Sequence, residues 1–139
     1  MIIHKSRVSS IHSSKLNVFN KDSGKLSVIQ SGNEIKWKIE RVFFISVTDP
    51  EIRGDHAHHV SQQAFVCTAG QVDLELSDGT EEKIFQLFPL EEVVVVPPGI
   101  WVTIKMSSMS SLAVLTDQPY DASDYIHDWE IFRKLKEMK

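Results

Sequence analysis

Residues 71–87 read QVDLELSDGTEEKIFQL and carry the clearest structural signal in the chain. From Val72 to Leu76 apolar and acidic side chains alternate, which is the period of a strand with one buried face. Asp78-Gly79 follows, a dipeptide that favours the tight turn of a β-hairpin. Residues 83–87 return as the partner strand. This stretch therefore predicts an antiparallel hairpin.

Strand signals continue on both sides of the hairpin. Upstream, residues 36–40 alternate polar and apolar and lead into the apolar run 42–45. Downstream, the four valines 93–96 form a β-branched run that ends at Pro97-Pro98-Gly99, and residues 101–106 and 112–116 follow as two more strands. Many short strands separated by turn signals are typical of a sandwich or barrel. We expect an all-β fold in a single domain, 1–139.

The two ends of the chain have different patterns. Residues 1–19 are rich in serine, so we expect an irregular N-terminal arm. Near the other end Tyr125, Trp129, Phe132 and Leu135 recur at three- and four-residue intervals, which predicts an amphipathic helix over residues 123–138. Asp121 or Ser123 could cap its start. We expect the helix to pack across the barrel or its mouth.

Composition narrows the class of protein. A chain of 139 residues with 42% hydrophobic and 24% charged residues fits one globular domain. The net charge of −4 argues against a nucleic-acid surface. No apolar run approaches the roughly 18 residues of a membrane helix, and the start lacks a secretory signal, so we expect a cytoplasmic protein that neither binds a membrane nor is exported. The single cysteine, Cys67, lies in an apolar strand pattern and is expected to be a buried, inert thiol.

Three of the six histidines crowd into residues 54–59, which read GDHAHH. On a strand His56 and His58 point to one face and His59 to the other. Two imidazoles on one wall can bind a metal together or share proton transfer, since histidine titrates near neutral pH. The alternative is a histidine pair on a solvated sheet face. Ala57 and the core-like residues 63–67 favour an enclosed position. The remaining histidines, His4, His12 and His127, have no informative context.

The spacing of these residues resembles the two cupin motifs. His56-x-His58, four residues to Gln63 and then Gly70 resemble the first motif, and residues 97–102 resemble the second. Metal cupins have glutamate at the place of Gln63 and histidine at the place of Val102. Because two remaining histidines seldom hold a catalytic metal alone, we expect no metal site.

Two longer segments, residues 53–58 and 120–129, together resemble the nucleotide-sugar 3,4-ketoisomerases, which are WxcM-like proteins with an RmlC-like cupin jelly roll. The resemblance implies a metal-free enzyme, without cofactor, that moves the ketone of dTDP-4-keto-6-deoxyglucose between C4 and C3 on the way to deoxyamino sugars of surface polysaccharides such as O-antigen. It also implies a homodimer, with residues 1–19 reaching across to the partner.

The same resemblance assigns roles to individual residues. His58 would be the principal acid/base and His56 its helper. Arg41 and Arg53 would hold the diphosphate by two-pronged hydrogen bonds. Substrate-binding positions also include Gln63 and Trp101, which we expect to line the pocket. For Trp101 the alternative is an ordinary core residue, since it is an aromatic residue that follows a Pro-Gly turn.

The chain departs from the family pattern at several positions. Where the family usually has a tyrosine, residues 42–45 offer only Phe43 and Phe44, and Val102 replaces a histidine or arginine. Residues 22–26 lack an arginine of the family, and Gln30 replaces a glutamate. Two alternatives therefore stay open: a non-catalytic cupin that binds a sugar nucleotide or carbohydrate, and an enzyme of another class, such as an epimerase.

Overall fold

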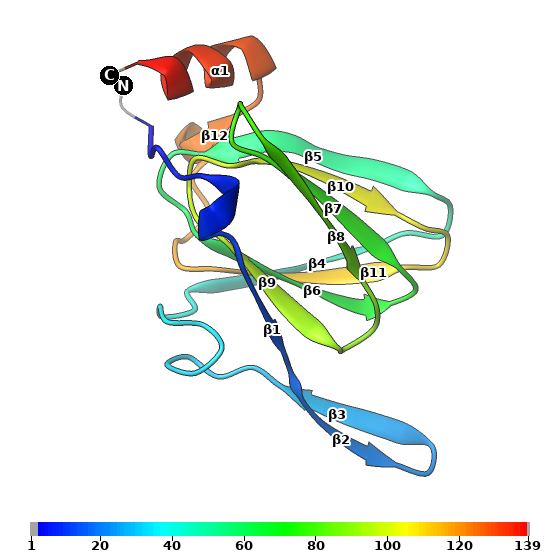
Figure 1. Cartoon of the computed structure of the whole chain (residues 1–139). Coiled ribbons are helices and arrows are strands. Elements are labelled where there is room, and N and C mark those ends of the chain that lie inside the picture. Colours follow the sequence, from blue (N-terminus) through cyan, green and yellow to red (C-terminus); the bar gives the residue numbers. More distant parts are fainter. Residues whose placement is uncertain (1–2, 139) are drawn as a thin grey trace.

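Two antiparallel sheets face each other in the computed structural model, which describes residues 3–138 (Figure 1). The first five-stranded sheet has the order β1-β9-β6-β11-β4, with β1 His12–Lys15, β9 Glu92–Val96, β6 Gln63–Ala69, β11 Ser111–Thr116 and β4 Arg41–Ser46. The second has the order β12-β5-β10-β7-β8, with β12 Tyr125–Ile126, β5 Glu51–His58, β10 Trp101–Met106, β7 Val72–Ser77 and β8 Glu82–Leu87. The all-β jelly-roll prediction is confirmed.

The predicted hairpin is β7 and β8, paired from Val72↔Leu87 to Ser77↔Glu82. In its turn the Asp78 carboxylate accepts hydrogen bonds from the backbone N–H groups of Thr80 and Glu81, and it also accepts one from Val8 of the N-terminal segment. Burial disfavours the charge on Asp78, but these bonds outweigh that effect and hold its pKa below the ordinary value. The turn therefore also anchors the start of the chain.

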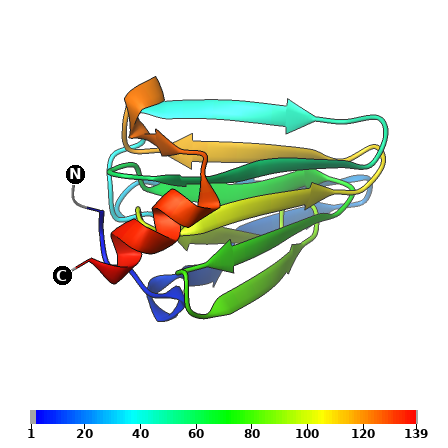
Figure 2. The same cartoon turned by 90° about the horizontal axis from the view of Figure 1, so that it is seen from above.

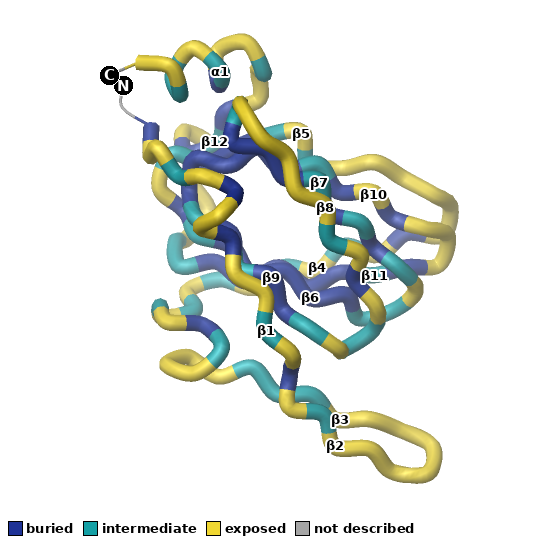
Figure 3. Tube along the Cα trace, in the orientation of Figure 1, coloured by how far each residue is buried: buried dark blue, intermediate teal, exposed yellow. Residues whose placement is uncertain are grey.

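The main core lies between the two sheets, where the inward-facing residues of both are buried (Figure 3). Cys67 is fully buried there, and burial raises the pKa of its thiol, as expected for an inert cysteine. The long side chains that fill this space include Phe65, Leu74, Leu76, Leu87, Ile100 and Leu112.

The N-terminal segment is more regular than its composition suggests. After a 3₁₀ turn, Val8–Ser10, strand β1 pairs with β9, so the expectation of an irregular arm is wrong for the described part, and residues 1–2 lie outside it. A polar sequence such as that of β1 can still form an edge strand, because the ladder is made by backbone groups. The next two strands, β2 Asn17–Lys21 and β3 Gly24–Val28, form a hairpin that projects away from the barrel (Figure 1).

The C-terminal helix is shorter than predicted. Helix α1 spans Trp129–Glu137 and is capped by Asp128, whose carboxylate accepts the N–H of Ile131 at 3.0 Å. The preceding residues form a 3₁₀ turn, Ala122–Asp124, and the short strand β12, which pairs with β5. The helix prediction was wrong here because the Asp121 carboxylate bonds the Ser123 N–H and closes a separate turn. Periodicity alone does not register such a stop.

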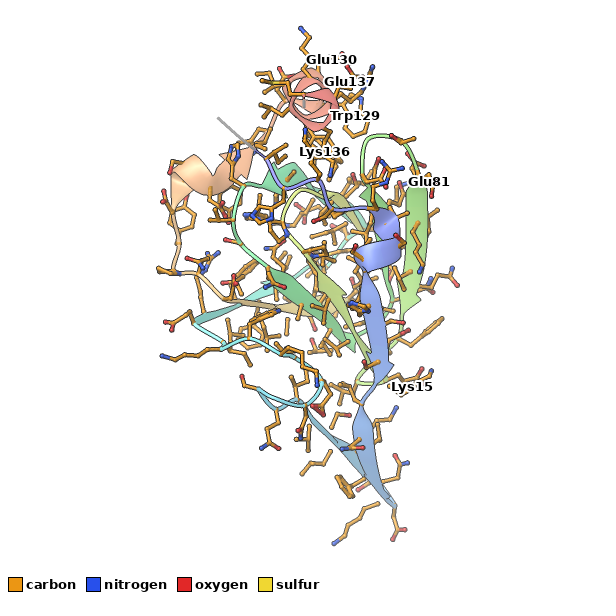
Figure 4. All side chains as sticks on the ribbon, turned by 60° about the vertical axis from the view of Figure 1, so that its left-hand side comes forward. Lys15, Glu81, Trp129, Glu130, Lys136 and Glu137 are labelled. Atoms are coloured by element: carbon orange, nitrogen blue, oxygen red, sulfur yellow. The ribbon has the colours of Figure 1, made fainter. Side chains whose placement is uncertain are left out.

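Helix α1 lies on the outer face of the second sheet (Figure 2). Its apolar stripe packs against that sheet. Phe132 is fully buried against Trp101 and Ala57. On the barrel side of the helix, the Lys136 ammonium donates to the carbonyls of His4, Ser6 and Gly99 (Figure 4). The helix therefore covers the sheet, not the mouth of the barrel. Within residues 3–138 no helix has the length and apolarity to cross a membrane.

Candidate active site

A bulge in β5 decides which of its side chains point inward. The register against β10 shifts between Val102↔His56 and Thr103↔Gly54, which leaves Asp55 as the extra residue. Asp55 has φ of 55° and Gly54 has φ of 85°. A Cβ on Gly54 would lie only 2.7 Å from the Val102 carbonyl oxygen, so only glycine fits. The bulge therefore shifts by one residue the alternation of β5 side chains between the two faces of the sheet.

As a result Arg53 and His56 share the inner face of the sheet. They stand opposite Ile104 and Val102, which are both buried in the core between the sheets. From His56 the ordinary alternation resumes, which puts His58 on the same side and Ala57 on the outer face beneath α1. The two histidines therefore share one face of β5, as the sequence pattern indicated, but only His56 is among the residues that line the neighbouring cavity.

A cavity of about 250 Å³ lies between the two sheets in front of this face of β5. Its polar lining comes from Arg53, His56, Gln63, Tyr125 and His127. Its apolar lining comes from Phe43, Ile45, Phe65, Val102 and Ile104. An apolar pocket with a few convergent polar groups is the usual form of a small-molecule site.

His58 is held by a buried carboxylate. Its Nδ1 lies 2.8 Å from Asp124 Oδ2, and the His58 and Asp124 side chains are only 3% and 5% exposed. Asp124 also accepts hydrogen bonds from the Ser61 hydroxyl and the Val60 N–H. Burial opposes its ionisation, but these three donors outweigh that effect and keep the pKa of Asp124 below its ordinary value.

The pair fixes the tautomer of His58. Burial lowers the pKa of His58, and the hydrogen bond and charge of Asp124 offset only part of that effect, so the ring is neutral at pH 7. The Asp124 carboxylate can only accept, which means that Nδ1 carries the proton. The lone pair is then on Nε2, a buried atom without a hydrogen-bond partner among residues 3–138. Such a nitrogen is a general base ready to accept a proton.

A cluster of aromatic rings surrounds His58. The His56 ring meets it edge-on with centroids 5.1 Å apart, and the Tyr125 ring lies 4.4 Å from His58 and 5.0 Å from His56. His127 stacks on Tyr125 at 5.6 Å with an interplanar angle of 7°. Burial lowers the pKa of His56 to about 4, and the neighbouring His58 adds to this effect because two adjacent imidazoles resist being charged together, so the His56 ring is also neutral.

The other residues named from the sequence fall in different places. Gln63 is buried and lines the cavity. Arg53 also lines it and forms an ion pair with Glu51 at 3.2 Å. Arg41 is the first residue of β4, and its guanidinium lies over the rings of Phe43 and Tyr120. Its Nε is buried and has no acceptor within the described part of the chain.

Trp101 does not reach the cavity, and the expectation that it lines the pocket is wrong. Since Val102 faces inward, Trp101 faces outward, where its ring lies 5.4 Å from Trp129 and 5.6 Å from Phe132. It is a core residue of the helix–sheet contact.

Three residues of the site were not predicted from the sequence. Asp124, Tyr125 and His127 all belong to the segment expected to be helical, where their side chains would have been distributed around a helix. The sequence signal that could have placed them is Asp121-x-Ser123, a turn-forming pattern directly before the short apolar pair of β12.

The cupin ligand positions that differ in the sequence also lie at the cavity. Gln63 and Val102 both line it, and neither side chain is an ordinary metal ligand. Across residues 3–138 no three or more His, Cys, Asp or Glu side chains are grouped to hold a metal ion.

Comparison with known proteins identifies the family. The model of the FdtA family, described as WxcM-like, C-terminal, matches residues 9–137. The chain belongs to the FdtA family. The resemblance inferred from the motifs is thereby confirmed.

Curated and solved relatives agree with this assignment. The TDP-4-oxo-6-deoxy-alpha-D-glucose-3,4-oxoisomerase of Aneurinibacillus thermoaerophilus is 34% identical over 116 residues, which cover 80% of this chain and 81% of that protein. QdtA, a sugar 3,4-ketoisomerase from Thermoanaerobacterium thermosaccharolyticum solved in complex with TDP, is 26% identical with a TM-score of 0.85 and covers 91% of this chain and 94% of its own. The 3,5-epimerase RmlC of Legionella pneumophila, with TM-score 0.76 and 15% identity over 90% of this chain and 75% of its own, shows the RmlC-like fold alone.

Within this FdtA-family chain the two phenylalanines of β4 face opposite ways. Phe43 points inward and lines the cavity, whereas Phe44 points outward and is 72% exposed. Of the two, only Phe43 faces a ligand in the cavity, and its side chain has no hydroxyl to offer.

Proposed function

We propose that this FdtA-family protein is a metal-independent isomerase that moves the keto group between C4 and C3 of a dTDP-linked 4-keto-6-deoxyhexose. The product would serve deoxyamino-sugar biosynthesis for surface polysaccharide. The single observation that carries the proposal is the buried His58–Asp124 pair, which leaves an unprotonated Nε2 on a ring packed against His56 and Tyr125, two residues that line the cavity. Relatives with 3,4-ketoisomerase activity support the reaction type.

The pair suits removal of a proton from carbon. In the proposed reaction Nε2 of His58 takes the proton from C3, and the electrons form an enediolate across C3 and C4. The imidazolium that results is stabilised by the ionised Asp124 at 2.8 Å. The same ring can then deliver its proton to C4, which moves the double bond to O3. His56, neutral and edge-on to His58, would assist by hydrogen bonding to the substrate.

We assign substrate binding to Arg41, Arg53 and Gln63. Arg41 has a buried Nε without an acceptor and a guanidinium held over two rings, so a phosphate oxygen would satisfy it. Arg53 lines the cavity, and its partial exposure leaves donors free beside the ion pair with Glu51. The buried Gln63 amide can hydrogen bond a sugar hydroxyl. The TDP complex of QdtA supports a dTDP ligand.

Solvent exchange followed by NMR tests the function. In deuterated water the protein should exchange the C3 proton of dTDP-4-keto-6-deoxyglucose. His58→Asn should abolish exchange while dTDP binding, measured by calorimetry, persists. His12→Asn, on an exposed strand outside the cavity, is the matched control and should behave as wild type. Exchange at C5 would favour an epimerase, and binding of dTDP without exchange at any carbon would favour the non-catalytic cupin.

A homodimer remains part of the proposal. The projecting hairpin β2–β3 exposes Phe19 and Leu26, and the outer face of β4 exposes Val42 and Phe44. Exposed apolar side chains of this size on a projecting hairpin and an edge strand are typical of a surface that another chain covers. Because β1 pairs within its own chain, our candidate for contacting the second copy narrows from residues 1–19 to the hairpin β2–β3, which begins at Asn17.

Light scattering on a sizing column tests the dimer. Wild type should elute as a dimer at micromolar concentration, and Phe19→Glu with Phe44→Glu should shift it toward monomer. Ile84→Glu is the control, because Ile84 is similarly exposed, at 60%, on β8 of the other sheet. A monomeric wild type would overturn the proposal. Cytoplasmic location stays a prediction from the sequence.

A further inference from the structure

A 3,4-ketone shift moves two protons, and His58 accounts for only one. The substrate has a ketone at C4, with a hydrogen on C3 and another on O3. The product has a ketone at C3, with a hydrogen on C4 and another on O4. One proton therefore travels between carbons and a second travels from O3 to O4. The second transfer needs an acid that can protonate O4 and then act as a base toward O3.

Tyr125 has the position for this second transfer. It lines the cavity, and its ring packs against both His58 and His56, at 4.4 and 5.0 Å. His127 also stacks on the Tyr125 ring in nearly parallel orientation, which restricts how the phenol can turn. Strand β12, which carries it, is fixed to β5 through Tyr125↔His58. The phenol is thus placed beside the carbon base by the backbone itself.

Other groups at the cavity suit the task less well. His56 has a pKa lowered to about 4, so its imidazolium form is rare at neutral pH. Phe43, on the facing strand, has no hydroxyl. Tyr120 is 67% exposed and has its ring against the Arg41 guanidinium. Arginine stays protonated and does not act as a base.

We propose that Tyr125 is a second catalytic residue, an acid and base that carries the oxygen-bound proton from O3 to O4. This inference rests on the proposed isomerase function. In the first step His58 removes the C3 proton, the C3–H electrons form the C3–C4 double bond, and the electrons of the C4 carbonyl move to O4. Tyr125 donates its hydroxyl proton to O4 and becomes a phenolate. The enediol now carries hydrogen on both oxygens.

The second step restores both side chains. The Tyr125 phenolate takes the proton from O3, the O3 electrons form the C3 carbonyl, and the double-bond electrons take the proton of the His58 imidazolium onto C4. His58 is neutral again and Tyr125 is again a phenol. No oxidant, reductant or further acid is required.

Tyr125→Phe is the direct test, since it keeps the ring packed against His56 and His58 and removes only the hydroxyl. We expect kcat to fall by roughly 10²–10³-fold, the range for loss of a general acid–base group. The dissociation constant for dTDP and the thermal midpoint should stay near wild type. Wild type run in parallel separates the two proposals: if wild type itself does not isomerise the sugar, the proposed function fails.

A second measurement covers the case in which Tyr125→Phe does not fold. Fluorinated tyrosine incorporated at position 125 makes the phenol more acidic, and the alkaline limb of the kcat profile should then move to lower pH. An isomerising wild type whose Tyr125→Phe variant keeps kcat within threefold would overturn the role of Tyr125. An alkaline limb that does not respond to fluorination would overturn it as well.

Discussion

The carboxylate of Asp124 can be neutralised with almost no change of shape by Asp124→Asn. In the native protein Oδ1 accepts the Val60 N–H at 2.7 Å, while Oδ2 accepts from His58 Nδ1 and from the Ser61 hydroxyl. The amide of asparagine has one acceptor and one donor end. The Val60 N–H is a fixed backbone donor, whereas the Ser61 hydroxyl can turn and accept. The amide oxygen should therefore remain at Val60, and its NH₂ should face His58.

This orientation gives His58 the wrong tautomer. The NH₂ donates to Nδ1, so the ring proton moves to Nε2 and the base is lost. The opposite orientation restores the tautomer but leaves the buried Val60 N–H unpaired, at a cost of about 1–3 kcal/mol. The imidazolium also loses its charge-assisted hydrogen bond, about 1.5–3 kcal/mol. Together these effects predict that kcat falls by about 10²–10⁴-fold, at roughly 1.4 kcal/mol per tenfold.

Kinetics as a function of pH measure this prediction. Since Asp124 raises the pKa of His58, its loss should also move the acid limb of the kcat profile to lower pH. Asp128→Asn is the matched control, because asparagine caps a helix as well as aspartate does, and its kcat should be unchanged. A kcat for Asp124→Asn within threefold of wild type, with an unchanged acid limb, would refute the reasoning.

Two further predictions concern stability. His56 has a pKa of about 4 in the fold against 6.5 for the free side chain, so its protonation favours unfolding. The stabilisation that this shift gives the fold is complete above pH 6.5 and is lost as the pH falls toward 4. In urea titrations at pH 7 and pH 4.5 the wild type should lose about 2 kcal/mol more unfolding free energy than His56→Gln, and an equal loss in both proteins would contradict this. Gly54→Ala should lower the unfolding free energy by about 2–4 kcal/mol, because the new Cβ would meet the Val102 carbonyl. Gly24→Ala is the control: its Cβ would have nothing within 4 Å, so the unfolding free energy should change by less than about 0.5 kcal/mol. Similar values for the two variants would be inconsistent with the bulge geometry.

The strands of the two sheets and the shared face of His56 and His58 could be predicted because they depend on local alternation. Residues 71–87 contain both the period and the turn of their hairpin, and the histidines are two residues apart on one strand. Even the bulge at Asp55 does not disturb their relation, since it comes before both. The cavity-facing position of Gln63 followed from motif spacing.

The predictions that were wrong concern residues whose positions depend on contacts between distant segments. Asp124 reaches His58 from a turn and a two-residue strand, and no periodicity in a segment that short separates it from the helix that follows. The apolar spacing predicted Tyr125 on a helix face, but the helix begins only at Trp129. Trp101 was assigned to the pocket from the family resemblance, whereas the face it occupies is set by its pairing with Ser77 in the neighbouring strand.

The order in which the chain is synthesised determines when β12 can attach to β5. His58 and the carboxylate that orients it are separated by 66 positions, so the carboxylate leaves the ribosome well after the histidine. A nascent or truncated polypeptide that ends after β11 already contains both histidines but has no carboxylate to set the tautomer of His58. A competent base therefore forms only after residue 124 has been made, and chains terminated before it should be inert even where their barrel has formed.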